Sequence, residues 1–119
     1  MHIECQNCAT KLTPELELVA PSDRKHEMGE QMLKQGSITQ EDGSYFHDQA
    51  GVYIAHPEDV ISMYLTSEPK RLAGCCGLDG CDGPNLVCEN CNTYVATKMT
   101  DCWMPHCIVF DRNTTREVA

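Results

Sequence analysis

Cys5-Gln6-Asn7-Cys8 near the beginning of the chain is matched by Cys88-Glu89-Asn90-Cys91 near its end. Each is a Cys-x-x-Cys turn, which directs two thiolates toward one point. A tetrahedral metal ion needs two such turns, or one turn and two other ligands. We therefore expect Cys5, Cys8, Cys88 and Cys91 to bind one ion together. The long segment between the turns is no obstacle, because loop-closure entropy grows only logarithmically with length.

The composition explains why this chain would depend on a metal. It has 119 residues but only two Phe and one Trp, so little aromatic material is available to fill a core. Small domains with thin cores commonly add disulfides or a structural metal. The nine cysteines are in keeping with that need. We expect one zinc-binding domain over residues 1–119.

Metal ligation is favoured over disulfides by the sequence context of the cysteines. The N-terminal residues Met-His-Ile-Glu-Cys show no secretory signal, and no stretch reaches the roughly 20 apolar residues that span a membrane. We therefore expect a cytoplasmic protein whose thiols stay reduced, and the odd number of cysteines also fits a disulfide framework poorly. The expected cofactor is Zn²⁺, one ion with room for a second. Iron or an iron–sulfur centre and disulfides are the alternatives, and an exported mature form would favour disulfides.

The charge of the chain indicates which partners it would bind. Nine basic and eighteen acidic residues give a net charge of −9, and a zinc ion held by four thiolates would add about two further negative charges. Phosphate backbones require a basic surface. We therefore expect a protein partner and neither nucleic acid nor membrane.

A second metal site is predicted from the remaining cysteines. A hairpin that bends at Met104-Pro105 would place Cys102 and His106 opposite each other, and Cys76 and Cys81 from a glycine-rich loop could complete a tetrahedron. Cys75 and Cys107 would then be left over, although Cys75 could replace Cys76. A different partition remains open, with one site made of Cys76, Cys81, Cys88 and Cys91 and the other of Cys5, Cys8, Cys102 and His106.

Catalytic use of the thiols or of the metal is the alternative to a structural role. A redox Cys-x-x-Cys normally opens a helix, whereas both pairs here precede strand-like alternation. A catalytic zinc would need three protein ligands, an open position and a nearby carboxylate such as Asp79, Asp82 or Asp101. Aspartates in glycine-rich loops more often simply form turns, so no catalytic residue is assigned.

Hydrophobic periodicity and turn residues predict a mixed set of elements. Strands are expected at 15–18, 37–39, 45–47 and 52–55. Two short helices are expected, one over 22–35 and one that starts at His56-Pro57 with Val60, Ile61, Tyr64 and Leu65 facing inward. The C-terminal part should be a hairpin of strands at 94–97 and 107–110, followed by a frayed end at 112–119.

The C-terminal third carries a resemblance to a known group of proteins. Gly74-Cys75-Cys76-Gly77-Leu78-Asp79-Gly80-Cys81-Asp82-Gly83-Pro84-Asn85, followed by Cys88-x-x-Cys91, Val95-Ala96-Thr97 and Asp101-Cys102-Trp103, resembles a group of small uncharacterised bacterial proteins, as does Cys5-x-x-Cys8. This resemblance implies a family but no activity. The two Cys-x-x-Cys turns alone are similar to the knuckles of zinc ribbons, a likeness of local geometry only. Zinc ribbons usually have Gly after the second cysteine, where this chain has Ala9 and Asn92.

Together these patterns predict an α+β fold. It would have a small, mostly antiparallel sheet, a zinc-ribbon-like part formed by residues 1–20 and 74–111, and an inserted α/β segment at 22–70 that contains the two helices. The expected function is that of a structural zinc protein acting as a protein-interaction or adaptor module. A zinc- or thiol-dependent enzyme or redox protein, and zinc storage or sensing, are the alternatives.

Overall fold

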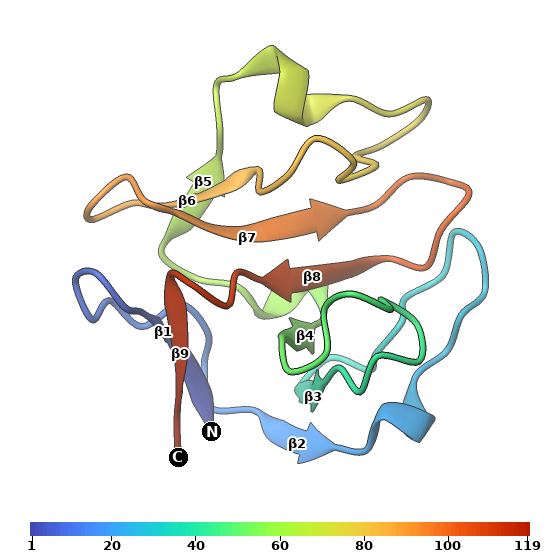
Figure 1. Ribbon diagram of the computed structural model, residues 1–119, viewed down its shortest axis with the longest axis horizontal. Helices are drawn as coiled ribbons and strands as arrows, with labels where there is room; N and C mark the ends of the chain where they lie inside the picture. The colour runs from blue at the N-terminus through green and yellow to red at the C-terminus, as the bar shows by residue number, and fades with distance from the viewer.

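Seven strands of the chain form one sheet in the computed structural model, which describes residues 1–119 (Figure 1). Their order across the sheet is β2 (Glu17–Val19), β3 (Ser37–Gln40), β4 (Tyr53–Ala55), β8 (Cys107–Phe110), β7 (Tyr94–Met99), β6 (Leu86–Cys88) and β5 (Met63–Leu65). Only β2 and β3 run parallel; every other neighbouring pair is antiparallel.

The chain termini form a separate antiparallel pair. β1 (His2–Cys5) runs alongside β9 (Thr115–Val118), with Cys5 opposite Thr115. Both ends of the chain therefore lie together, as the two strands below the left end of β8 show in Figure 1. The expectation that residues 112–119 are frayed is wrong, because Thr115–Val118 within this segment are paired with β1.

The predicted C-terminal hairpin is present at the centre of the sheet. β7 pairs with β8 from Ala96 opposite Phe110 to Met99 opposite Cys107, and the chain bends between them. All four residues of β8 are buried because the strand lies between β4 and β7. This hairpin is the frame on which the glycine-rich loop and the bend at residues 100–106 are placed.

Two groups of buried side chains make up the core. The larger contains Ile3, Leu12, Ile38, Val95, Ile108 and Phe110 among its members, and it also includes Cys5 and Cys88. The smaller consists of Met32, Leu33, Val52, Ile54, Cys107 and Val109. Because Cys5 and Cys88 are themselves core residues, both Cys-x-x-Cys turns are anchored in the larger core group.

The predicted α+β class is wrong, because the regular secondary structure of the protein is nearly all strand. Its helical residues form only three short 3-10 turns, η1 (Pro21–Asp23), η2 (Pro57–Asp59) and η3 (Pro69–Leu72). None of them is long and apolar enough to cross a membrane. Each has proline in its first turn, which favours the start of a helix. None of the three continues into a longer helix.

The helix expected over residues 22–35 is replaced by an irregular segment whose hydrogen bonds go to a distant part of the chain. Gly29 has a positive φ of 78°, which a helix does not tolerate, and its N–H donates to the Met104 carbonyl at 2.9 Å. Met32 donates to the His106 carbonyl at 3.0 Å, and His106 donates to the Glu30 carbonyl at 2.7 Å. These tertiary hydrogen bonds override the helical spacing of the methionines.

The helix expected from His56 onward ends after three residues. The His56 side chain accepts from the Glu58 N–H at 2.9 Å and caps η2, but Val60 is already extended and Ser62 has a positive φ of 59°. The chain then continues as strand β5. Ile61, Tyr64 and Leu65, expected to face inward, are instead between 42% and 45% exposed.

Candidate metal centres

The two Cys-x-x-Cys turns fold as near copies of each other. Both read Cys-x-Asn-Cys-x-Thr, at 5–10 and at 88–93. In the first, Ala9 donates its N–H to the Cys5 carbonyl at 2.8 Å; in the second, Asn92 donates to the Cys88 carbonyl at 2.9 Å. Ala9 and Asn92 both have a positive φ, of 63° and 61°. The turns are therefore knuckles, in which the residue after the second cysteine adopts the left-handed conformation that zinc ribbons usually assign to glycine.

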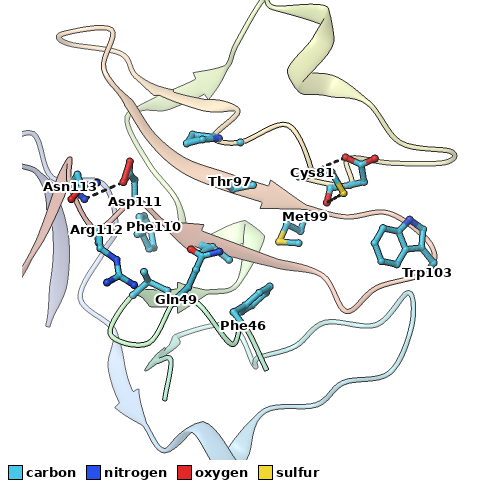
Figure 2. A pocket seen from close by; sticks show the side chains of 16 residues that line it. Phe46, Gln49, Cys81, Thr97, Met99, Trp103, Phe110, Asp111, Arg112 and Asn113 are labelled. Atoms are coloured by element: carbon cyan, nitrogen blue, oxygen red, sulfur yellow. Dashed lines mark hydrogen bonds between the residues drawn. The ribbon is translucent and has the colours of Figure 1, made fainter. Parts of the chain in front are cut away.

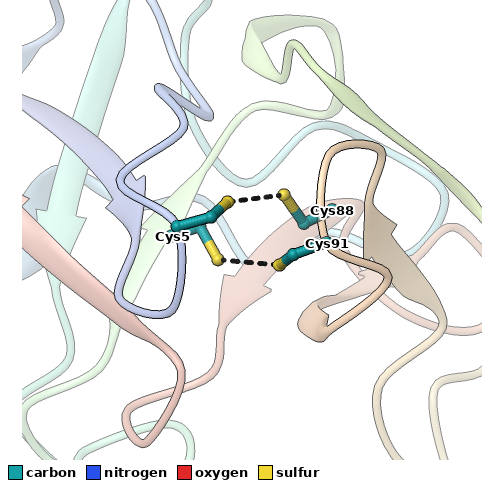
Figure 3. A group of neighbouring side chains, drawn as sticks. Cys5, Cys88 and Cys91 are labelled. Atoms are coloured by element: carbon teal, nitrogen blue, oxygen red, sulfur yellow. Dashed lines mark hydrogen bonds between the residues drawn. The ribbon is translucent and has the colours of Figure 1, made fainter.

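The four sulfur atoms of the two knuckles face each other across a small gap (Figure 3). Cys5 Sγ lies 3.6 Å from Cys91 Sγ, and Cys8 Sγ lies 3.6 Å from Cys88 Sγ. All four lie within 4.8 Å of one another. Metal–sulfur bonds of about 2.3 Å in a tetrahedron place the sulfurs about 3.8 Å apart. The knuckle centre, defined as Cys5, Cys8, Cys88 and Cys91, therefore has the size and donor set for one tetrahedral ion.

Each knuckle supplies hydrogen bonds to sulfur atoms of the centre. The Thr10 hydroxyl lies 3.0 Å from Cys8 Sγ, and the Thr93 hydroxyl lies 3.2 Å from Cys91 Sγ. The Asn90 side chain, followed by Thr10, lowers the pKa of Cys8 to about 6. Asn7 of the first knuckle, followed by Thr93 of the second, likewise lowers the pKa of Cys91. Such outer hydrogen bonds stabilise thiolates and orient them toward a metal.

Burial acts in the opposite direction on Cys5. Removal from water raises the pKa of its thiol to about 12, whereas the amides of Cys8 and Asn7 lower it by less. Cys5 and Cys88 are completely buried. A cation would compensate the charge of thiolates packed this closely, and metal binding would then stabilise the fold. The knuckle centre is closed to solvent on the side of the core, as in structural sites.

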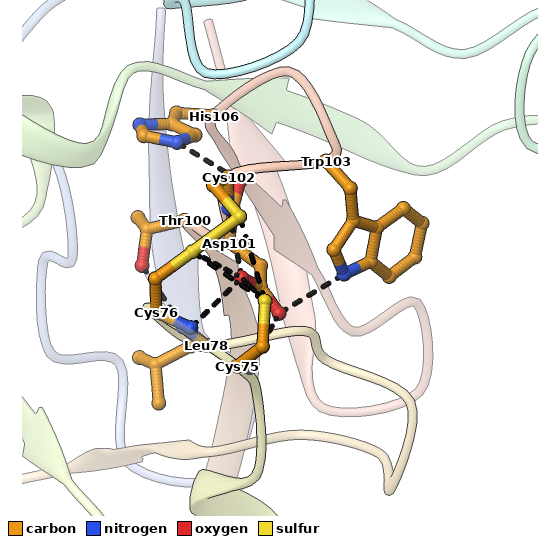
Figure 4. The surroundings of a disulfide bond; sticks show 8 residues. All are labelled: Cys75, Cys76, Leu78, Thr100, Asp101, Cys102, Trp103 and His106. Carbon is orange, nitrogen blue, oxygen red and sulfur yellow. Dashed lines mark hydrogen bonds between the residues drawn. A yellow bond between two sulfur atoms is a disulfide. The ribbon is translucent and has the colours of Figure 1, made fainter.

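A second group of cysteines lies at the bend between β7 and β8 (Figure 4). Cys76 and Cys102 form a disulfide. Cys75 Sγ lies 3.5 Å from Cys76 Sγ and 3.4 Å from Cys102 Sγ. All three cysteines are exposed, whereas the neighbouring Asp101 is buried. We call Cys75, Cys76 and Cys102 the surface thiol cluster.

Glycine makes the turn that carries the adjacent cysteines. A Cβ on Gly74 would lie 1.7 Å from the Gly77 carbonyl oxygen, and a Cβ on Gly77 would lie 2.2 Å from the Thr100 carbonyl oxygen. Only glycine fits at either position, so the loop doubles back on itself and rests against Thr100-Asp101. The glycines on both sides of Cys75-Cys76 are the sequence signal for this arrangement.

Asp101 holds the two halves of the surface thiol cluster together. Its carboxylate accepts from the backbone N–H groups of Cys75, Cys76 and Cys102 at 3.1, 3.2 and 2.8 Å, and from Trp103 Nε1 at 3.0 Å. Burial alone would raise its pKa, but the hydrogen bonds from the Cys75 thiol and these backbone amides outweigh that effect and lower the pKa to about 2. The same carboxylate raises the pKa of the Cys75 thiol.

The structure agrees with the predicted ligand set at the first site and differs from it at the second. It brings Cys5, Cys8, Cys88 and Cys91 together, which is the first of the two partitions considered. In the second group Cys76 meets Cys102, but Cys75 and Asp101 join them in place of Cys81 and His106.

Two of the predicted second-site ligands have other contacts. Cys81 lies in the loop beside Asp79, 3.8 Å from its carbonyl, and His106 Nε2 is 3.2 Å from the Asp101 carbonyl oxygen. Cys107, left over in the sequence analysis, is buried in the smaller core group, and burial raises its pKa to about 12.

A cavity of about 520 Å³ lies between the glycine-rich loop and the β7–β8 hairpin (Figure 2). Its walls include Phe46, Met99 and Phe110; Trp103 lies at one end and Arg112 at the other. Gly80 lets the loop approach β7 here, because a Cβ on it would lie 2.8 Å from Met99 Cγ. Cys81 also lines this cavity.

No known protein family, curated protein or solved structure matches this chain. Fold and sites together define its class: a sheet-rich protein in which two cysteine groups could each hold a metal ion.

Proposed function

We propose that the protein is a structural zinc protein whose knuckle centre binds one Zn²⁺. The observation that carries this proposal is the approach of four sulfur atoms to within 4.8 Å of one another, from two knuckles at opposite ends of the sequence. Structural zinc sites are almost always tetrahedral, and thiolates are common ligands in them. A reducing cytoplasm would keep the four thiols available for it.

The zinc ion would join the two sheets of the molecule. The first knuckle begins at the last residue of β1, and the second begins at the last residue of β6. β1 belongs to the terminal pair and β6 to the large sheet. A metal bond between the knuckles therefore crosslinks two sheets that share no strand.

Native mass spectrometry of protein purified under reducing conditions tests the zinc assignment. We expect a tightly bound zinc ion that Cys88→Ser and Cys91→Ser both remove, whereas Cys107→Ala retains it, because Cys107 lies in the other core group. Cys91 is only half-buried, so its variant serves if Cys88→Ser does not fold. Full zinc occupancy in folded Cys91→Ser would overturn the assignment.

We further propose that the module binds a protein partner along β5. β5 is an edge strand that pairs only with β6, and Ile61, Tyr64 and Leu65 beside or on it are exposed. Exposed edges with apolar side chains accept an added strand. The second knuckle supports this edge, since Glu89 donates its N–H to the Ser62 carbonyl at 3.0 Å and the Tyr64 hydroxyl donates to Asn92.

The charge of the molecule favours a basic, extended segment as the partner. With a net charge of −9, the chain would attract a cationic peptide and repel nucleic acid. Selection from a random peptide library, with counter-selection against Leu65→Lys, tests this. We expect basic peptides with alternating apolar residues, which bind Leu65→Lys at least ten-fold more weakly. Leu18→Lys, on the opposite edge strand β2, is the matched control. Equal weakening by both variants would contradict the proposal.

A further inference from the structure

The surface thiol cluster differs from the knuckle centre in what surrounds its sulfur atoms. Cys75, Cys76 and Cys102 are all exposed, whereas Cys5 and Cys88 are completely buried. Three sulfur atoms approach each other there, from a vicinal pair in one loop and a single cysteine in another. The glycines that enforce this turn and the buried carboxylate that holds both loops show that the cluster is built by the fold.

Asp101 lies against the thiols, with Cys75 Sγ at 3.2 Å and Cys76 Sγ at 3.1 Å from one carboxylate oxygen, and both of its oxygens also accept N–H groups. One carboxylate oxygen accepts from the N–H groups of Cys76 and Cys102, and the other accepts from Cys75 N–H and Trp103 Nε1. Each oxygen therefore already has two N–H donors, which assigns the carboxylate to positioning the thiols. The donor set that remains is three thiolates with a fourth position toward solvent.

We propose that, in the reduced protein, Cys75, Cys76 and Cys102 bind one soft divalent cation of the Zn²⁺ and Cd²⁺ class at an exchangeable site, and that the Cys76–Cys102 disulfide is the alternative state that excludes the ion. Thiolates select soft ions. The buried carboxylate beside the cluster adds negative charge, which favours a divalent over a monovalent cation. An open fourth position makes the ion accessible to competing ligands, unlike an ion in the knuckle centre.

The change between the two states balances with a small-molecule disulfide as the oxidant. The Cys76 thiolate attacks one sulfur of the oxidant and releases the first small thiolate. The Cys102 thiolate then attacks Cys76 Sγ in this mixed disulfide, so that the Cys76–Cys102 bond forms and the second small thiolate leaves. Two electrons pass from the protein to the oxidant. The cation departs because only the Cys75 thiolate remains to bind it.

Trp103 provides a local signal for both states. It is the only tryptophan in the sequence, is 52% exposed, and donates its indole N–H to Asp101 at 3.0 Å. Binding at the cluster or formation of the disulfide changes what surrounds Asp101, which bonds both the Cys75–Cys76 loop and the indole. Either event should therefore change the tryptophan fluorescence. Metal binding at the knuckle centre should leave the fluorescence unchanged.

Titration of the reduced, metal-free protein with Cd²⁺ tests the proposal. We expect two equivalents to bind, one removed by a chelator at least ten-fold faster than the other, with a fluorescence change that belongs to the fast equivalent. Oxidised glutathione, added after one equivalent of Cd²⁺ has filled the knuckle centre, should abolish the fast equivalent alone. Cys75→Ser and Cys102→Ser should do the same, whereas Cys81→Ser, another exposed loop cysteine, should retain both.

The result separates this proposal from the one on the knuckle centre. Cys91→Ser should remove the slow equivalent and leave the fast one. If Cys102→Ser does not fold, Cys75→Ser decides, because Cys75 is outside the disulfide. A fast equivalent that survives Cys75→Ser, or that Cys81→Ser removes, would overturn the proposal.

Discussion

Ala9 illustrates how a single residue bears on the knuckle centre. It stands where the second knuckle has Asn92, and both have a φ near 60°. For an alanine the left-handed conformation costs about 1–2 kcal/mol, whereas asparagine tolerates it better. The first knuckle is therefore formed against its local preference, held by Ala9 N–H to the Cys5 carbonyl and by the main-chain bond from Cys5 to Thr10 at 2.8 Å.

Ala9→Gly should therefore stabilise the protein. Relief of the left-handed strain exceeds the added entropy of the unfolded chain, and we expect a gain of about 0.5–1 kcal/mol in the free energy of unfolding. Urea unfolding measures it. Ala20→Gly is the control, because Ala20 has a φ of −69° and its replacement should destabilise. A loss of stability in Ala9→Gly would show that the strain is not there.

Asn90 acts at the same scale but across the two knuckles. Its side chain is the largest contribution that lowers the pKa of Cys8. Asn90→Ala removes this hydrogen bond, and we expect zinc affinity to fall about ten-fold or more. Competition with a chromophoric chelator measures the change, with Asn113→Ala as a control outside the knuckles. Unchanged affinity in Asn90→Ala would mean that Asn90 does not orient Cys8.

At the scale of elements, Tyr53 connects the large sheet to the terminal strands. Its hydroxyl, on β4, donates to Glu117 on β9. Burial and the neighbouring Glu117 carboxylate raise the pKa of Tyr53 to about 12 from the ordinary value of 10.0. The neutral phenol is thus the form that stabilises the folded state.

The sign of this pKa shift fixes an alkaline prediction. Because the pKa is raised on folding, the contribution of Tyr53 is complete below pH 10 and is lost as the pH rises through about 12. The stability advantage of the wild type over Tyr53→Phe should therefore shrink between pH 10 and 12. Thermal unfolding at several pH values measures it. Tyr64→Phe is the control, and a constant difference across this range would contradict the prediction.

Strands could be predicted where a strand pairs with the next strand along the chain. The β7–β8 hairpin follows from alternating residues on both sides of a Met104-Pro105 bend, because that information is local. The helix over 22–35 failed because Met32 and Leu33 fit a helical stripe as well as an extended segment. The hydrogen bonds that decide between them come from Met104 and His106, far along the chain.

The candidate sites divide in the same way. The knuckle centre could be predicted because each half is a contiguous four-residue turn. The second group was predicted only in part: Cys76 and Cys102 were expected together, but the inclusion of Cys75 and Asp101 depends on Gly74 and Gly77 folding against Thr100. That turn points Cys75 toward Cys102 and leaves Cys81 on another side of the loop.

On the scale of the whole molecule, the knuckle centre is a crosslink between distant parts of the chain. Cys8 and Cys88 are 80 positions apart. By analogy with a covalent crosslink over a loop of that length, metal binding should contribute about 4 kcal/mol or more to stability.

Removal of the metal should therefore loosen the terminal strands first. After treatment with a chelator under reducing conditions, we expect a lower melting temperature and fast amide exchange in β1 and β9, with slower change in β7 and β8. Hydrogen exchange detected by mass spectrometry resolves these segments. The Cys75→Ser protein is a suitable background, since it isolates the knuckle centre. Unaltered exchange in β1 would contradict a crosslinking role.

X-ray absorption at the zinc edge is the most direct measurement of the knuckle centre. It is best made on reduced Cys75→Ser protein loaded with one equivalent of Zn²⁺, so that only the four knuckle thiolates are available as a complete set. We predict four sulfur neighbours at about 2.3 Å and no nitrogen or oxygen ligand. Fewer than four sulfurs, or a nitrogen or oxygen in the first shell, would contradict a closed zinc site formed by Cys5, Cys8, Cys88 and Cys91.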